Sequence, residues 1–361
     1  MLHLDFLRIV AALGIVALHW RGSLALPDGP SALLEHRMDG LNQAVDLFFV
    51  ISGAVIHHVY RGQMSTGRQV VTFLRKRLAR LAPLHWATLL LYVVLGFVAL
   101  KAGASPKSAA RYDPSCILPN ILFLQATGMC RSATYNFASW SISAELVVYM
   151  LAPLFLFLRS RAFWLPALLA GVCLVILCAI GPAGQNHTEW YRWTYDQGFW
   201  RAIPAFALGV SLDAARPLLR RLPHAATATF LAMGALVILS LMDEWRGAVV
   251  IMTYVVVALA IAADARGQAH RLVRTFAPMG QLTYSVYMLH LPMQTVLLSM
   301  IGERVLHLPP AAQNGLVLLA VPLLLACSYL SLFFFEQPLR RLMSGQRRSA
   351  PKAEPLLSVA P

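Results

Sequence analysis

Residues 4–20, LDFLRIVAALGIVALHW, decide the fold, because this stretch is apolar enough to cross a bilayer yet contains ionisable side chains. Arg8 and His19 are eleven residues apart, and eleven helical steps return both side chains to within about 20° of one face, roughly 16 Å apart along the axis. An arginine at the centre of a membrane helix costs about 2.5–3.5 kcal/mol, so such residues usually face a protein interior or a wet cavity. Asp5 shares this face and is placed to pair with Arg8. The stretch predicts a membrane helix with a site on one wall.

The composition agrees with a membrane protein. Of the 361 residues, 58% are hydrophobic and 13% are charged, whereas soluble domains carry about 25% charged residues. The net charge of +14 comes from basic residues between apolar stretches, without a basic patch interleaved with aromatics, so we do not expect a nucleic-acid partner. The first apolar stretch lacks a basic leader and a small-residue cleavage site, so we expect it to be retained.

Apolar stretches near 20 residues predict an all-α polytopic membrane bundle of about ten transmembrane helices. They cover approximately residues 4–22, 44–60, 80–100, 140–158, 163–181, 199–214, 225–242, 247–263, 280–301 and 315–335. The stretch 117–127 is too short to span and contains Pro119 and Asn120, which favours an interfacial or re-entrant segment.

Lys and Arg residues are about twice as frequent in the loops on one side of this topology, which predicts that both termini are cytoplasmic. We expect a membrane domain over residues 1–343. The remaining residues, 344–361, are polar and rich in Pro and Ala, and they predict a disordered cytoplasmic tail.

The same topology places four ionisable residues in the outer half of the bundle: His19, Asp46, Glu145 and Arg201. The basic segment 73–83, FLRKRLARLAP, stands at the opposite, cytoplasmic mouth. An anionic cofactor at the inner mouth, with acyl chemistry deeper or further out, fits this separation. Two other interpretations stay open, because Asp46 is also suited to an N-terminal helix cap and Glu145 to a counter-ion of Arg201.

Seven short motifs follow one another along the chain. The first four are Arg8–x10–His19, residues 45–53 (VDLFFVISG), the set Phe73, Lys76, Arg77, Arg80 and Pro83, and residues 140–145 (WSISAE). The last three are Arg201 with Phe206 and Gly209, the set Gly280, Tyr284, Ser285, Tyr287 and His290, and residues 336–338 (EQP). Each motif alone is weak. In this order they resemble the integral-membrane acyltransferase 3 family, which moves acyl groups, usually acetyl, onto cell-surface sugars. The chain departs from the family pattern at Lys76, Leu81 and Thr283, which replace Arg, Ile and Ser.

The resemblance implies a multi-pass O-acyltransferase of the bacterial inner membrane. Its donor substrate would be acetyl-CoA or another acyl-CoA, with no permanently bound cofactor. Its acceptor would be a hydroxyl of a cell-surface, exported or lipid-linked glycan, and its surroundings would be membrane lipids. The acceptor itself stays open among a lipopolysaccharide O-antigen, an exopolysaccharide, a glucan, peptidoglycan and a small molecule.

The resemblance also implies roles for individual residues. His19 would act as general base or transient acyl carrier, Glu145 or Asp46 would orient it, and Arg8 would position the donor. Donor binding would fall to Lys76, Arg77, Arg80, Tyr284 and Ser285. Structural or acceptor-side roles would fall to Arg201, Trp140, Ser143, His290 and Glu336.

Three further expectations come from the residues themselves. Cys116 and Cys130 both lie in the outer loop 101–139, where an oxidising compartment allows a disulfide, and two unpaired thiols are the alternative. The sequence contains no zinc-binding, P-loop or G-x-S-x-G motif, so we predict neither a metal site nor a soluble-hydrolase serine nucleophile. The alternative function is a carrier or flippase for a lipid-linked sugar, although no inverted repeat supports it.

Overall fold

The computed structural model describes residues 1–101, 103, 110–180, 189–242 and 246–345, and within these ranges the chain is helical without a strand. This confirms the predicted all-α class. By length and composition, six helical stretches among the described residues are suited to cross a membrane: Leu2–Ser23, Asp28–Tyr60, Gly67–Lys101, Phe137–Arg161, Gly247–Ala265 and Pro310–Ser344. The predicted count of ten spans and the predicted orientation therefore stay predictions.

The described α-helices are α1 (Leu2–Trp20), α2 (Asp28–Met38), α3 (Ala44–Tyr60), α4 (Gly67–Lys101), α6 (Ile117–Ile121), α7 (Trp140–Arg161), α8 (Leu165–Ile180), α9 (Phe199–Ala214), α10 (Arg216–Leu219), α11 (Ala225–Ser240), α12 (Arg246–Ala265), α13 (Arg271–Phe276), α14 (Thr283–Met293), α15 (Pro310–Leu330) and α16 (Gln337–Ser344). Short 3-10 helices are η1 (Arg21–Ser23), η2 (Asp39–Gln43), η3 (Pro114–Cys116), η4 (Phe137–Ser139), η5 (Trp190–Arg192) and η7 (Ala277–Leu282). Two π-helices, η8 (Gln294–Val305) and η9 (Ser331–Glu336), continue α14 and α15.

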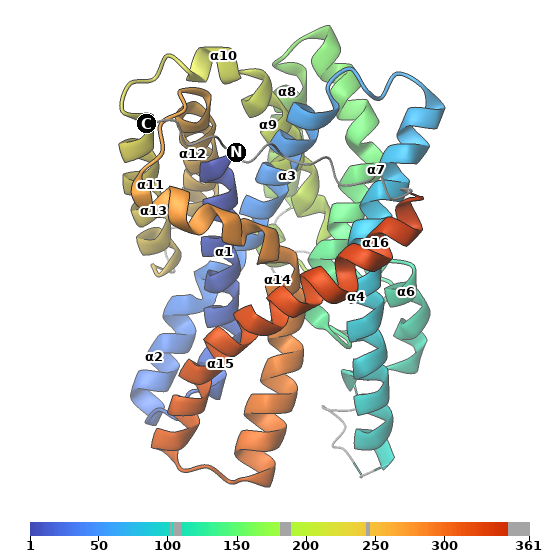
Figure 1. Cartoon of the computed structure of the whole chain (residues 1–361), viewed down its shortest axis with the longest axis vertical. Coiled ribbons are helices and arrows are strands. Elements are labelled where there is room, and N and C mark those ends of the chain that lie inside the picture. The colour runs from blue at the N-terminus through green and yellow to red at the C-terminus, as the bar shows by residue number, and fades with distance from the viewer. Residues whose placement is uncertain (102, 104–109, 181–188, 243–245, 346–361) are drawn as a thin grey trace, which may run out of the picture.

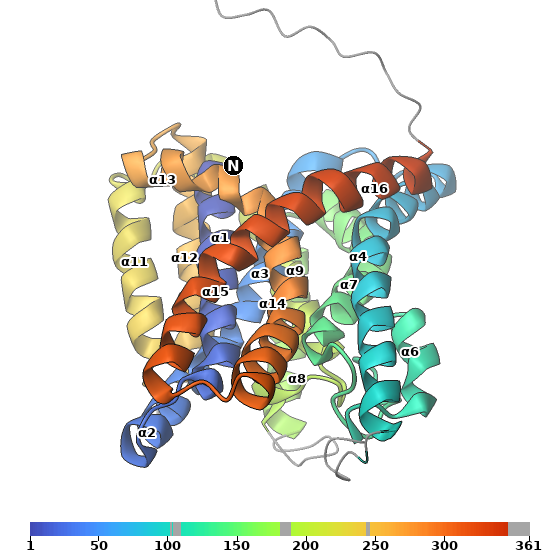
Figure 2. The same ribbon diagram turned by 60° about the horizontal axis from the view of Figure 1, so that its bottom comes forward.

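The long helices form a bundle around α1 and α3 (Figure 1). The start of α1 lies at the same end of the bundle as α13 and α16, and α2 lies at the opposite end (Figure 2). Arg8 therefore lies toward the first of these ends and His19 toward the second.

The tail expected from residue 344 lies outside the described residues from 346 onward.

Helices α3 and α9 pack with their backbones in direct contact. A Cβ atom added at Gly53 would lie 2.1 Å from the Phe206 carbonyl oxygen, and one added at Gly209 would lie 2.0 Å from the Val50 carbonyl oxygen. Small residues allow this close approach between membrane helices. The contact fixes how the polar residues of α3 face those of α9.

The segment expected to be interfacial or re-entrant forms the short helix α6, which is tied to the side of α4. The His85 ring donates from Nε2 to the Asn120 carbonyl at 2.8 Å, and the Trp86 indole donates to the Ile121 carbonyl at 3.1 Å. A disulfide joins Cys116 to Cys130, with their Cα atoms 5.8 Å apart. These three connections hold the loop that leads into α7.

Candidate active site

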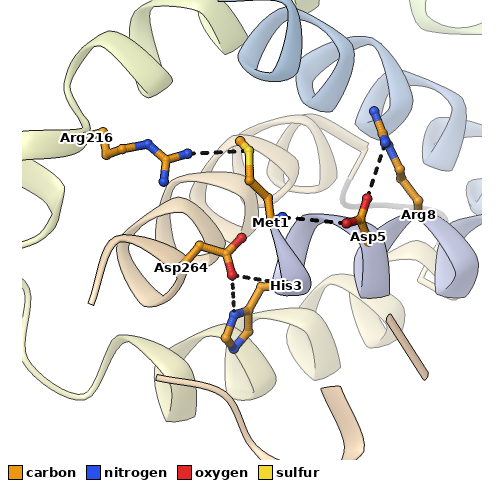
Figure 3. Close-up of polar contacts among 6 residues, drawn as sticks. All are labelled: Met1, His3, Asp5, Arg8, Arg216 and Asp264. Atoms are coloured by element: carbon orange, nitrogen blue, oxygen red, sulfur yellow. Dashed lines mark hydrogen bonds and ion pairs between the residues drawn. The ribbon is translucent and has the colours of Figure 1, made fainter. Parts of the chain in front are cut away.

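A cavity of about 420 Å³ opens at the end of the bundle where α1 begins, and we call it the guanidinium cavity because Arg8, Arg80 and Arg340 line it. Arg8 donates to the Asp5 carboxylate at 3.4 Å (Figure 3). Within the described part of the chain, Arg80 and Arg340 make no hydrogen bond or ion pair. Because two of its three guanidinium groups have no direct ion-pair partner among the described residues, this cavity is suited to an anion with several phosphate oxygens.

The start of α1 is anchored to neighbouring helices, which fixes the place of Arg8. The His3 backbone donates to the Asp264 carboxylate at 3.0 Å, and the His3 ring nitrogen Nδ1 lies 2.9 Å from the same oxygen (Figure 3). Arg216 contacts the Met1 sulfur at 3.5 Å and pairs with Asp213 at 2.7 Å. The start of α1 is thus held by Asp264 of α12 and by Arg216 at the start of α10, which Asp213 of α9 orients.

A narrow central cavity of about 70 Å³ continues inward from the guanidinium cavity, since Arg8, Arg80 and Tyr284 line both. Glu145 on α7 lines its side, and the Tyr149 and Ser52 hydroxyls donate to Oε1 of this carboxylate. Tyr287 also lines the central cavity, and its hydroxyl accepts from Ser141 at 2.8 Å and donates to the Ala138 carbonyl at 2.9 Å. Tyr287 therefore links this cavity to His290, since the centres of the two rings lie 5.7 Å apart.

Arg77, which the sequence assigned to donor binding together with Arg80, lines none of the cavities described here. Its guanidinium carbon lies 5.1–5.6 Å from the ring centres of Tyr60, Phe73 and Tyr149, and it donates to the Tyr60 hydroxyl at 2.9 Å. Such cation–π contacts stabilise a desolvated guanidinium. Arg77 thus packs behind the Tyr149 side chain that holds Glu145, and Arg80 faces the cavity.

A polar cavity of about 560 Å³ lies at the other end of α1, and we call it the His19 cavity. Its wall includes Gln43 of η2 and Asp196, both only 2% exposed. Neither polar atom of the Gln43 amide has a hydrogen-bond partner among the described residues, and the same holds for Oδ2 of Asp196. A buried polar group without a partner costs about 1–3 kcal/mol. These atoms are therefore suited to hydrogen-bond a ligand in the cavity.

His19 contacts a second histidine. Nδ1 of His19 lies 3.0 Å from the Ile15 carbonyl oxygen and 3.0 Å from Nε2 of His290 on α14. The two rings are tilted, with centres 4.9 Å apart, and the Phe137 ring packs edge-on against His19. His290, expected in a structural or acceptor-side role, therefore belongs to the immediate surroundings of the proposed base.

Asp46 and Arg201 form a buried pair with each other. Arg201 donates to the two Asp46 oxygens at 3.2 and 2.8 Å and to the Trp193 carbonyl at 3.0 Å, with its guanidinium 5.0 Å from the centre of the Trp140 ring. The alternative interpretation of Glu145 as the counter-ion of Arg201 is therefore wrong, since Asp46 pairs with Arg201. Neither carboxylate makes a hydrogen bond or ion pair with His19 in the described structure, so the four outer residues do not form one cluster.

Several other motif residues support the framework. Ser143 donates to the Phe123 carbonyl at 2.6 Å and anchors the loop before α7. Ser285 donates to Glu336 at 2.6 Å. Neither Ser285 nor Lys76 lines a cavity described here. Glu336 itself lines the guanidinium cavity. Tyr284 donates to the Leu81 carbonyl and lines both the guanidinium cavity and the central cavity.

Sequence reasoning missed Arg340, Gln43 and Asp196 as site residues. Arg340 lies two residues beyond the 336–338 motif and counted only as a loop charge, although α16 carries it to the cavity mouth. Gln43 and Asp196 lie in a 3-10 turn and in a connecting segment, where no helical periodicity indicates the direction of a side chain.

Comparison with known proteins identifies a family and a relative of this chain. The model of a family described as an acyltransferase domain matches residues 1–335. The acyltransferase MdmB of Streptomyces mycarofaciens is 31% identical over 180 residues, which cover 48% of this chain and 44% of that protein. The match thus spans less than half the length of that relative. No solved structure matches the chain.

Proposed function

This chain belongs to the acyltransferase family, and from that premise we propose a multi-pass O-acyltransferase of the inner membrane that transfers an acyl group, foremost acetyl, from acyl-CoA to a hydroxyl of an exported or lipid-linked glycan. One observation carries the proposal: α1 joins a cationic cavity at one end of the bundle to a polar cavity containing a histidine at the other. This arrangement suits a reaction whose donor and acceptor enter from opposite faces.

The guanidinium cavity is the proposed donor site. Guanidinium groups bind phosphate oxygens through paired hydrogen bonds, and the phosphates of CoA offer several such oxygens. Arg80 and Arg340 would hold the phosphates, because neither makes an ion pair with a described carboxylate. Arg8 would take the part of the donor nearest the central cavity, since it lines both cavities.

The His19 cavity is the proposed acceptor site. Its volume of about 560 Å³ falls within the range of about 300–1,000 Å³ that is usual for small-molecule sites. A sugar carries adjacent hydroxyl groups, each able to donate and accept a hydrogen bond. Gln43 would satisfy both kinds of group and Asp196 Oδ2 would accept from one, which would place another hydroxyl near His19.

His19 would act as general base in the transfer. Its Nε2 would remove the proton from the acceptor hydroxyl, and the oxygen would form a bond to the thioester carbon as the carbon–sulfur bond breaks. The departing thiolate would then take the proton from His19. Tyr287 lies between the central cavity and the histidine pair, so its ring has to turn aside for the acyl end of the donor to arrive.

Membrane vesicles from a host that makes the acceptor would test this function. Vesicles with the wild-type protein should incorporate label from [¹⁴C]acetyl-CoA into extractable glycan, and vesicles with His19→Ala should not. His270→Ala is a matched control, because His270 lies in a different surface crevice beside Phe230. Full incorporation by a well-expressed His19→Ala protein would contradict the mechanism.

A further inference from the structure

The backbones around the two histidines are locked together by reciprocal hydrogen bonds between α1 and the α14–η8 segment. The Trp20 indole donates to the His290 carbonyl at 3.0 Å, and the Gln294 side-chain amide donates to the His19 carbonyl at 2.7 Å. Gln294 begins the π-helix η8, a type of turn that is frequent at functional sites. The separation of the two backbones that carry the rings is therefore fixed by the fold.

The hydrogen-bond partners assign the protons of both rings. A neutral imidazole carries one N–H, and a carbonyl oxygen can only accept. Nδ1 of His290 lies 2.5 Å from the Tyr287 carbonyl oxygen, so its proton is on Nδ1 and its Nε2 carries a lone pair. Nδ1 of His19 faces that lone pair and the Ile15 carbonyl, which both require a donor. Hence the His19 proton is also on Nδ1.

This assignment leaves Nε2 of His19 as the basic nitrogen. The described residues offer it no hydrogen-bond partner, and His19 lines the polar cavity. The Phe137 ring against His19 and the Tyr287 ring against His290, with centres 5.4 and 5.7 Å apart, restrict rotation of both imidazoles. The pair thus presents one nitrogen of His19 to the cavity in one protonation form.

We propose that His290 is the positioning residue of His19, a neutral imidazole standing where a carboxylate usually orients a catalytic histidine. This inference rests on the proposed role of His19 as base. When Nε2 takes the proton of the acceptor hydroxyl, the bond from His19 Nδ1–H to His290 Nε2 becomes charge-assisted and stronger. His290 is fully buried, and it neither gains nor loses a proton during the cycle. The proton passes from the acceptor oxygen to His19 and then to the departing thiolate.

Two substitutions separate this role from simple packing. His290→Asn keeps an N–H near the position of Nδ1 for the Tyr287 carbonyl but has no acceptor that reaches His19. His290→Gln places an amide oxygen near the position of Nε2 and keeps the acceptor. We expect His290→Asn to lower kcat of acetyl-CoA turnover about 100-fold with KM for acetyl-CoA unchanged, and His290→Gln to stay within about tenfold of wild type. Equal losses in both variants, or wild-type kcat in His290→Asn, would overturn the proposal.

A second measurement does not depend on activity. In wild-type protein labelled with ¹⁵N-histidine, solid-state NMR should show a protonated Nδ1 of His19 correlated with an unprotonated Nε2 of His290. A protonated Nε2 of His290, or no correlation, would refute the hydrogen bond. If the wild-type protein turned over no acyl-CoA, the proposed function would fail, whereas the NMR result would still decide how the two rings are paired.

Discussion

Replacing Asp46 tests whether this carboxylate stabilises the bundle or takes part in catalysis. The Arg201 side chain is completely buried and its main anionic partner is Asp46, whose side chain is 13% exposed. Removing one partner of a buried ion pair typically costs about 3–5 kcal/mol, because the other charge stays buried without compensation. Asp46→Leu should therefore lower the free energy of unfolding by about that amount.

The double variant Asp46→Leu/Arg201→Met provides the comparison. It removes both charges together, so no buried charge stays without its partner. We expect it to be more stable than Asp46→Leu alone, and this non-additivity measures the coupling of the pair. Unfolding in detergent would be followed by tryptophan fluorescence.

Turnover decides between the two roles of Asp46. Acetyl-CoA turnover per folded molecule, measured below the unfolding transition of the weakest variant, should be close to wild type in both variants. A stable Asp46→Leu protein without turnover would refute the structural role and restore the catalytic role that the sequence suggested.

Three further predictions follow from other contacts. Arg80→Ala should weaken CoA binding at least about tenfold by calorimetry, whereas Arg77→Leu should chiefly lower the unfolding midpoint; equal losses of CoA affinity would refute the separate roles. Gly53→Ala should destabilise the protein by about 1–3 kcal/mol because its Cβ would meet α9, and Gly234→Ala, with nothing within 4 Å, should not. Cys116→Ser should lower the free energy of unfolding by about 3 kcal/mol, and an unchanged midpoint would contradict a stabilising disulfide.

The sequence predicted the position of a residue along its helix better than it predicted which residues of other helices contact it. A helix rises about 1.5 Å per residue, so the ends of a span and the separation of Arg8 from His19 can be read directly. Asp46 and Arg201 were correctly assigned to one level, but their pairing joins residues 155 positions apart. That pairing depends on the close contact of α3 with α9 through Gly53 and Gly209, and a list of spans does not state which helices touch.

The same reason explains why Glu145 was expected to orient His19, although His290 is the residue that contacts the His19 ring. The packing of the helices decides the surroundings of these two residues. Helix α7 places Glu145 in the cavity that Arg8 and Arg80 line, and α14 places His290 at the end of α1. Motifs identified the residues, but only tertiary packing separated them into two groups.

The ten residues between Arg8 and His19 on α1 set the distance between the guanidinium cavity and the His19 cavity. Because eleven steps return to nearly the same face, both side chains look into the interior of the bundle, yet about 16 Å separates them. In the proposed reaction, Arg8 would therefore contact the donor in one cavity while His19 would act on the acceptor in the other. A stiff helix keeps this distance constant, whereas a loop would let it vary. The helix thus sets how far the acyl end of a donor anchored at Arg80 has to extend, and Tyr287 stands on that path.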